Sequence, residues 1–215
     1  MVSKEVSPLI DKIVILAASL GGPPLVNDIL SGLVKDFSMP VVVLQQMESD
    51  FSEPLTAAWS KTSVLKTVRL QQRRSIYNGE AYVIPYGMCP MFERKEDLLS
   101  AHSQRCGQEG DVSLQWGSCF KNCADVFAGQ VILIMLTNAA LKTEELKSDL
   151  LSLQKSGGTI VYCRESQEVS GSFSSEKPPV SGYLEMEIDQ IVSYLNKLSA
   201  SPYQVPEAIP DFRNG

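Results

Sequence analysis

Residues 12–23 read KIVILAASLGGP, and the rest of the architecture can be worked out from this stretch. Its first half is continuously apolar after Lys12, which is typical of a β-strand that is buried on both faces. A glycine pair and two prolines then turn the chain, and proline is well tolerated in the first turn of a helix. Apolar residues follow with helical spacing from Leu25 to Leu33. The stretch therefore predicts a buried strand, a tight turn and a helix.

The same alternation continues along the chain. We expect further strands at residues 40–45, 67–71, 80–84, 112–116, 131–136 and 159–163, and helices at residues 52–61, 120–127, 143–155 and 188–198. Strands that are separated by helices predict an α/β fold with a doubly wound, mostly parallel sheet and helices on both faces. Ligands bind such sheets at the carboxyl ends of the strands.

Three stretches lack a sustained period and are predicted to be irregular. The polar stretch 93–111 is interpreted as a loop or insertion with at most one helical turn, and residues 166–182 are interpreted as a loop. Residues 199–215 are expected to form a C-terminal tail. The remaining residues, 1–198, are expected to form a single domain.

Composition narrows the function classes. The chain has 215 residues and a net charge of −6, which argues against a nucleic-acid partner. No apolar run exceeds strand length, so no membrane span is expected. The N-terminus does not resemble a secretory signal, and we expect a cytoplasmic protein.

Histidine and cysteine usage limits the possible chemistry. A single histidine, His102, excludes a site with several histidine ligands, and we expect no metal and no cofactor. Five cysteines, an odd number, favour reduced thiols. Cys119 and Cys123 are four residues apart on an expected helix, but two further metal ligands are not apparent. They are interpreted as small buried residues.

Ser19 follows the first predicted strand, and the local sequence allows two interpretations. It is either an exposed nucleophile whose oxyanion the free N–H groups of the next helix bind, or a residue that caps this helix. A third possibility makes the Gly21-Gly22 turn a phosphate cradle, although no nucleotide-binding fingerprint accompanies it.

Several motifs resemble the catalytic domain of the chemotaxis protein-glutamate methylesterases, the CheB family. The family segment G-A-S-[TS]-G-G-P is similar to residues 17–23, and its P-V-hydrophobic-Q-H-M segment to residues 40–47. V-Y-[VI]-A-P-G-G is similar to residues 81–87, and L-T-G-M-G-x-D-G to residues 136–143. The resemblance covers residues 12–198 and implies the same α/β fold. Family members usually carry an N-terminal receiver domain, for which we expect no room here.

The resemblance implies a Ser-His-Asp triad that hydrolyses γ-glutamyl methyl esters on chemoreceptors, and this sequence departs from it. Only the serine persists, as Ser19, while Gln46 stands at the histidine position and Lys142 at the aspartate position. An amide has no basic nitrogen near neutral pH, and lysine inverts the charge of aspartate. Asn138 and Ala140 replace glycines of the loop that helps form the oxyanion hole.

These departures favour a catalytically degenerate, protein-interaction or regulatory module of a bacterial chemosensory or type IV pilus signalling system. Its partner would be a receptor, a histidine kinase or a response regulator. The expected binding cleft comprises Leu20, Gly21, Gly22, Met47, Asn138, Ala139 and Ala140. The alternative is an active methylesterase or related serine hydrolase, in which Ser19 works with a rebuilt base.

Two side chains are candidates for the rebuilt base. His102 would have to fold back from the polar stretch, and Lys142 would have to lose a proton through desolvation. Separately, Lys66, Arg69, Arg73 and Arg74 form a small basic cluster. This cluster is interpreted either as a solvated surface or as a contact for an acidic partner.

Overall fold

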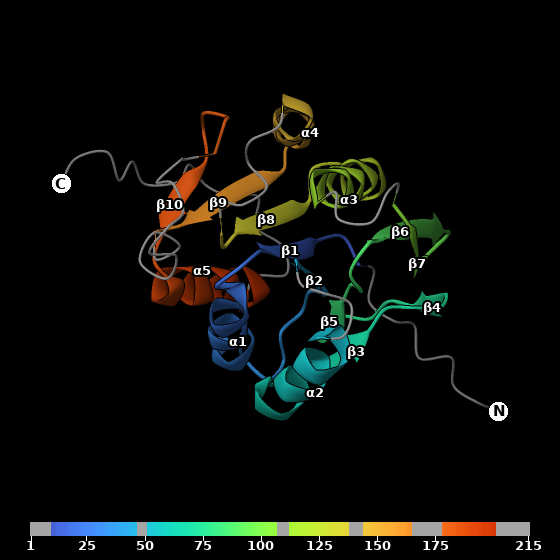
Figure 1. Ribbon diagram of the computed structural model, residues 1–215, viewed down its shortest axis with the longest axis vertical. Helices are drawn as coiled ribbons and strands as arrows, with labels where there is room; N and C mark the ends of the chain where they lie inside the picture. Colours follow the sequence, from blue (N-terminus) through green and yellow to red (C-terminus); the bar gives the residue numbers. More distant parts are fainter. Residues whose placement is uncertain (1–9, 47–50, 107–111, 138–143, 165–177, 201–215) are drawn as a thin grey trace.

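In a computed structural model of the protein, residues 10–46, 51–106, 112–137, 144–164 and 178–200 are described (Figure 1). Within them a parallel sheet is built from β1 (Ile13–Ala18), β2 (Val41–Gln45), β3 (Lys66–Arg69), β5 (Glu80–Val83), β8 (Val131–Met135), β9 (Thr159–Cys163) and β10 (Leu184–Met186). The seven strands lie in the order β10-β9-β8-β1-β2-β5-β3, and every neighbouring pair is parallel.

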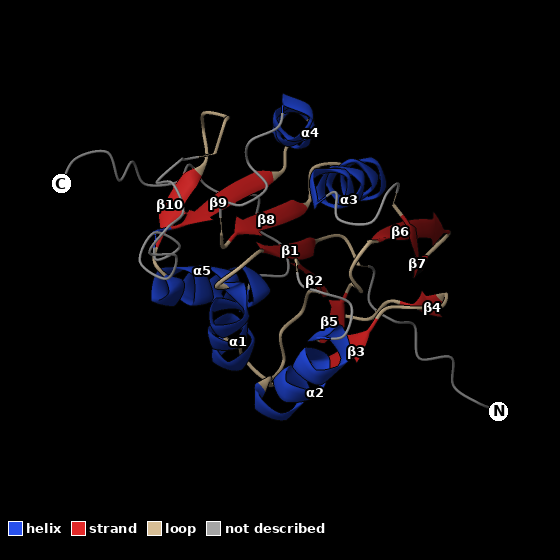
Figure 2. Ribbon diagram, in the orientation of Figure 1, coloured by secondary structure: helices blue, strands red, loops and turns tan. Residues whose placement is uncertain are grey.

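Helices cover both faces of this sheet. They are α1 (Gly22–Gly32), α2 (Ser52–Thr62), α3 (Val112–Phe127), α4 (Glu144–Lys155) and α5 (Ile188–Ala200). Figure 2 shows α1, α2 and α5 on one face and α3 and α4 on the other. Alternate residues of β1 serve the two layers: Ile15 packs in the core under α3, and Leu16 packs in the core under α1. The predicted doubly wound α/β fold is confirmed.

The sheet reverses its direction of growth at β1. The chain first adds β2, β5 and β3 on one side of β1, and later places β8, β9 and β10 on the other side. The topological switch point therefore lies between β1 and β8, where open α/β sheets bind their ligands. Both strands are continuously buried, because they occupy the centre of the sheet.

The prediction of an irregular polar stretch at residues 93–111 is wrong over residues 93–105. Antiparallel strands β6 (Met88–Lys95) and β7 (Leu98–Arg105) form a hairpin there, and β4 (Arg74–Ser75) pairs with β7. The hairpin packs only one face on the core: Leu99 and Ala101 are buried, while their polar neighbours are not. Buried and exposed residues alternate here, as in a strand with one face on the core. The alternation is hard to recognise in the sequence because the stretch contains many charged residues. Residues 107–111 lie outside the described part.

The predicted break between a strand at residues 112–116 and a helix at residues 120–127 is also wrong, because α3 is continuous from Val112 to Phe127. Gly117, a poor helix former, lies inside this helix. A Cβ atom at this position would lie 2.1 Å from Asp149 Oδ2 of α4. The glycine leaves room for the Asp149 side chain, and the packing of α3 on α4 overrides its low helix propensity.

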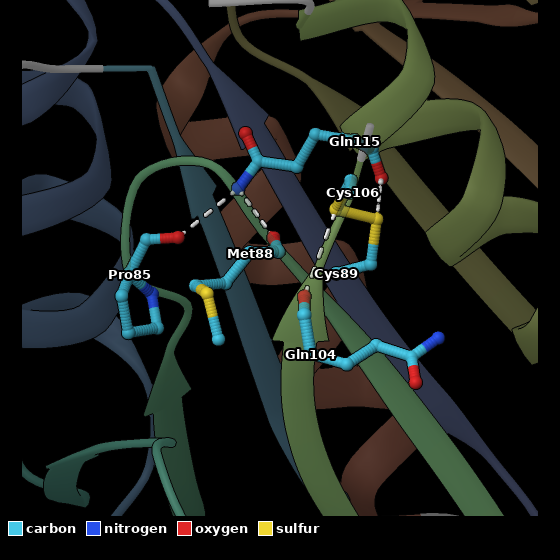
Figure 3. The surroundings of a disulfide bond; sticks show 6 residues. All are labelled: Pro85, Met88, Cys89, Gln104, Cys106 and Gln115. Atoms are coloured by element: carbon cyan, nitrogen blue, oxygen red, sulfur yellow. Dashed lines mark hydrogen bonds between the residues drawn. A yellow bond between two sulfur atoms is a disulfide. The ribbon is translucent and has the colours of Figure 1, made fainter. Parts of the chain in front are cut away.

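The expectation that all five cysteines are reduced is wrong as well. Cys89 and Cys106 form a disulfide with their Cα atoms 5.4 Å apart, whereas Cys119, Cys123 and Cys163 are buried and are not disulfide-bonded. The hairpin brings the two partners together across its open end (Figure 3). Beside the disulfide, the Gln115 amide of α3 donates to the carbonyl oxygens of Pro85 (3.3 Å) and Met88 (2.8 Å).

The remaining expectations concern the chain's end, membranes and metals. Helix α5 extends to Ala200, two residues into the expected tail, and the rest of that tail is outside the described residues. In the described ranges, no helix is long and apolar enough to cross a membrane. Among these same residues, no group of three or more metal-ligating side chains is found.

Candidate functional site

Ser19 lies at the switch point, directly after β1. Its backbone N–H donates to Thr137 Oγ1, and the two side-chain oxygens, Ser19 Oγ and Thr137 Oγ1, are 2.5 Å apart. Thr137 follows β8, the neighbour of β1, so this contact joins the two strands on either side of the switch point. Both residues are buried, with Ser19 only 1% exposed. The hydroxyl is therefore engaged within the protein.

The end of β2 holds the other side of Ser19. The Gln45 side-chain amide donates to the carbonyl oxygens of Ser19 (2.8 Å) and Gln46 (2.9 Å). The Gln46 N–H in turn donates to Ala18 O over 2.7 Å. These bonds place Gln46, the residue expected at the family's histidine position, beside the segment that carries Ser19. Gln45, the last residue of β2, is itself buried, so its side chain holds the Ser19 and Gln46 carbonyl groups in fixed positions.

The turn after Ser19 depends on its two glycines. Gly21 is the N-cap of α1 and has a φ of 80°, a conformation that side-chain-bearing residues rarely adopt. At Gly22, a Cβ atom would lie 2.5 Å from Ala18 Cβ and 2.8 Å from Gln45 Oε1. No side chain caps α1. The interpretation of Ser19 as the helix cap is therefore wrong, since its hydroxyl bonds to Thr137 instead.

The structure describes only part of the expected binding cleft. Leu20 is 68% exposed at the turn, Gly21 is the N-cap of α1, and Gly22 is the first residue of this helix. Four residues expected in the cleft and the residue at the family's aspartate position fall outside the described ranges: Met47, Asn138, Ala139, Ala140 and Lys142.

Two residues that hold Ser19 were not among the candidates from the sequence. Thr137 and Gln45 both follow or end a predicted strand next to a candidate residue. Their position beside a candidate residue was the feature from which they could have been predicted, because neither threonine nor glutamine indicates a functional site by its chemistry. The family resemblance directed attention to Gln46 and not to its neighbour Gln45.

His102 belongs to the small sheet. It lies in β7, where it pairs with Met91, and its Nδ1 atom is buried without a hydrogen-bond partner among the described residues. Nearby, the Arg73 guanidinium hydrogen-bonds to Glu93 and holds the pKa of this carboxyl below its usual value, with a smaller contribution from His102. No hydrogen bond joins His102 to Ser19 within the described ranges.

The described geometry offers Ser19 no general base. Its hydroxyl partner is another hydroxyl, which cannot accept a proton near neutral pH, and the neighbouring side chains at the end of β2 are carboxamides. What the arrangement does provide is a rigid edge, in which hydrogen bonds tie the ends of three adjacent strands together.

Comparison with known proteins places these features in context. The family model described as CheB methylesterase matches residues 14–172. A protein-glutamate methylesterase/protein-glutamine glutaminase of Geobacter metallireducens is 29% identical over 161 residues, covering 74% of this chain and 45% of that protein. A protein of the same description from Geobacter sulfurreducens is 24% identical over 188 residues, covering 87% of this chain and 48% of that protein.

The fold has a counterpart among solved structures. The CheB methylesterase catalytic domain of Thermotoga maritima matches with a TM-score of 0.68 at 19% identity, covering 87% of this chain and 98% of that domain. At this identity the likeness concerns the fold alone. The chain spans about half the length of the curated relatives it matches.

Proposed function

This chain belongs to the CheB methylesterase family, and from that premise we propose that it is a catalytically degenerate member which binds protein partners instead of hydrolysing esters. Its place would be a chemosensory or type IV pilus signalling system in the cytoplasm. The observation that carries the proposal is the surroundings of Ser19, where a glutamine occupies the position of the general base.

Geometry supports the assignment of Gln46 to that position. Its backbone bonds to Ala18, the residue before Ser19, so the side chain at position 46 starts one strand away from the serine. A histidine here would be a suitable base, whereas an amide cannot take the proton that a nucleophilic serine must lose. Disabling a triad member typically removes several orders of magnitude in rate.

The Ser19 hydroxyl also lacks the environment of an activated nucleophile. It is buried and shares a hydrogen bond with Thr137. Attack on an ester would require this bond to be exchanged for one to a base. Within the described ranges His102 does not supply that base, since its ring belongs to β7 and makes no bond to Ser19. Lys142, at the aspartate position, brings the opposite charge.

A retained fold without the triad favours binding. The edge at the switch point is built from backbone and side-chain bonds that do not need the triad, so it can persist as a docking surface. We propose that this surface comprises Leu20, Gly21 and Gly22 together with Met47, Asn138, Ala139 and Ala140. Chemoreceptor cytoplasmic segments are the first partner to test.

Two measurements on the purified protein test the proposal. A fluorophosphonate probe, which labels activated serines, should leave Ser19 unmodified under conditions in which an active methylesterase is fully labelled. Methylated receptor fragments should release methanol at the same rate with the wild-type protein, with Ser19→Ala and with buffer. Calorimetry should detect binding of the same fragments, unchanged by Ser19→Ala.

Methanol release that Ser19→Ala abolishes would overturn the proposal and establish the active esterase. Absence of binding to receptor, kinase and response-regulator fragments alike would overturn the docking role. Gln46→His is a useful additional variant, because it restores the family residue at a single position without altering the hydrogen bonds made by the Gln46 backbone.

A further inference from the structure

A polar hollow of about 580 Å³ lies along the connection from β3 to β4 and beyond. It is lined by Arg69, Gln71, Gln72, Arg73, Arg74, Ser75 and Tyr77, and this lining contains three arginines and no acid. We propose that the hollow binds carboxylate side chains of an acidic protein segment. The proposal goes beyond the function above by assigning a second contact surface and the chemistry of its ligand.

Two of the three arginines already have carboxylate partners. Arg73 makes a bidentate ion pair with Glu93, with N–O distances of 2.8 and 2.9 Å. Arg74 pairs with Glu80 at 3.0 Å and lies over the ring of Tyr82. These pairs hold both guanidinium groups, which belong to residues that line the hollow. Arginine forks that are held in this way lose less conformational entropy when they bind a further oxyanion.

Arg69 differs from its neighbours. It ends β3 and is half-buried, and no described carboxylate forms an ion pair with it. Its Nε atom, like that of Arg74, is shielded from solvent without a hydrogen-bond partner among the described residues. The Arg69 guanidinium is therefore available for an oxyanion, and a carboxylate matches its planar fork.

The local charge is opposite to that of the molecule. Two glutamates form ion pairs with the basic cluster (Lys66, Arg69, Arg73 and Arg74). Glu80 pairs with both Lys66 and Arg74, and Glu93 pairs with Arg73. Four cations against two carboxylates leave an excess of two positive charges on a chain whose net charge is −6. On a chain that is negatively charged overall, this local excess favours the hollow as a contact for an acidic partner.

The size and position of the hollow favour a polypeptide over a single small anion. The lining is formed by seven of the nine residues from Arg69 to Tyr77, with glutamine amides and Ser75 as additional donors. Arg69 also lies at the carboxyl edge of the sheet, three strands from β1. That separation is about 14 Å at the usual strand spacing. A segment docked at the switch point could thus extend into the hollow, a reach that rests on the proposed binding function.

The test uses a fluorescein-labelled acidic peptide with glutamates at alternate positions, and the same peptide with glutamine in their place. We expect the glutamate peptide to bind the full chain in anisotropy titrations, more weakly as salt is raised. Arg69→Gln should weaken binding about tenfold or more, because a charge-assisted hydrogen-bond pair is lost. Gln72→Glu, at an exposed position of the lining, should weaken it by adding a like charge without disturbing the core.

The matched control is Arg164→Gln, which makes the same charge change five strands away and should leave the affinity unchanged. Equal binding of the glutamine peptide, equal loss in the control, or full binding by Arg69→Gln would overturn the proposal. Competition by inorganic phosphate at low concentration that depends on Arg69 would also overturn it, in favour of a phosphate site. If Arg69→Gln still binds receptor fragments with full affinity, the proposed binding function stands, but the proposal that the hollow binds carboxylates of the partner is contradicted.

Discussion

At the scale of single residues, hydrogen bonds to two side chains hold Ser19: that of Thr137, which follows β8, and that of Gln45, which ends β2. Thr137 accepts the Ser19 N–H and shares a hydrogen bond with its hydroxyl, and Gln45 binds the Ser19 carbonyl. In an active hydrolase the serine would be free to exchange its proton with a base. Here its polar groups are satisfied within the fold, so Ser19 contributes hydrogen bonds to the structure of the switch point.

Thr137→Val tests this structural role. The substitution keeps the shape of the side chain but removes the hydroxyl, and it leaves the buried Ser19 N–H and Oγ without their partner. We expect the free energy of unfolding to fall by about 1–3 kcal/mol, the cost of unsatisfied buried polar groups. Urea denaturation measures the change. Thr137→Ser, which keeps the hydroxyl, should lose clearly less, and an equal loss in both variants would contradict the role of the hydrogen bonds.

At the scale of elements, the hairpin β6–β7 is attached to the main body at its open end. The disulfide joins Cys89 to Cys106, and Gln115 of α3 binds the turn that precedes β6 through Pro85 and Met88 (Figure 3). The Cys106 N–H also donates to Gly87 O at 3.1 Å. The small sheet is thus connected to the segment that leaves β5, at the same sheet edge as Gln46.

The disulfide should stabilise the protein measurably. It closes a loop with a sequence separation of 17 residues, for which loop-closure entropy predicts about 3 kcal/mol. We expect a reductant to lower the free energy of unfolding of the wild-type protein by roughly this amount and to have no effect on the double variant Cys89→Ala, Cys106→Ala.

Thiol counting gives an independent check. Under denaturing conditions the unreduced protein should show only the thiols of Cys119, Cys123 and Cys163. In the native state these should resist alkylation, because they are buried and burial raises the pKa of the Cys123 thiol. A full set of reactive thiols in the unreduced, denatured protein would contradict the disulfide.

At the scale of the whole molecule, one sheet serves two cores. Trp59 of α2 is buried in the core under α1, α2 and α5, and Trp116 of α3 is buried in the core on the other face. The small sheet contributes Phe92 and Leu99 to the second core. Since alternate residues of the central strands belong to different cores, we propose that the domain unfolds as a single unit.

Single-tryptophan variants test this cooperativity. In Trp59→Phe and in Trp116→Phe, the fluorescence transition of the remaining tryptophan should coincide with the loss of far-UV circular dichroism. Phe92→Ala should lower the stability reported by both probes by about 3–5 kcal/mol. Leu98→Ala, on the same hairpin but 56% exposed, should have little effect. An earlier transition for Trp116 alone would indicate that the small sheet and its core unfold separately.

The sequence by itself determined the parallel sheet and the order of its elements. Strands such as β1, β2 and β8 are buried on both faces, so their composition alone distinguishes them from the amphipathic helices between them. The departures at Gln46 and Lys142 were equally visible, because a residue's identity needs no structure. These local features were sufficient for the fold class and for the expectation of lost chemistry, but not for the hairpin β6–β7, the continuous helix α3 or β10.

Only the tertiary structure decided which residues meet. Ser19 and Thr137 are 118 positions apart, Gly117 is explained by a contact with another helix, and Cys89 reaches Cys106 only because the polar stretch between them folds into a hairpin. Each of these features depends on groups distant in the chain. Local patterns cannot encode such partners, because the free energy that selects them comes from packing and hydrogen bonding in the assembled fold.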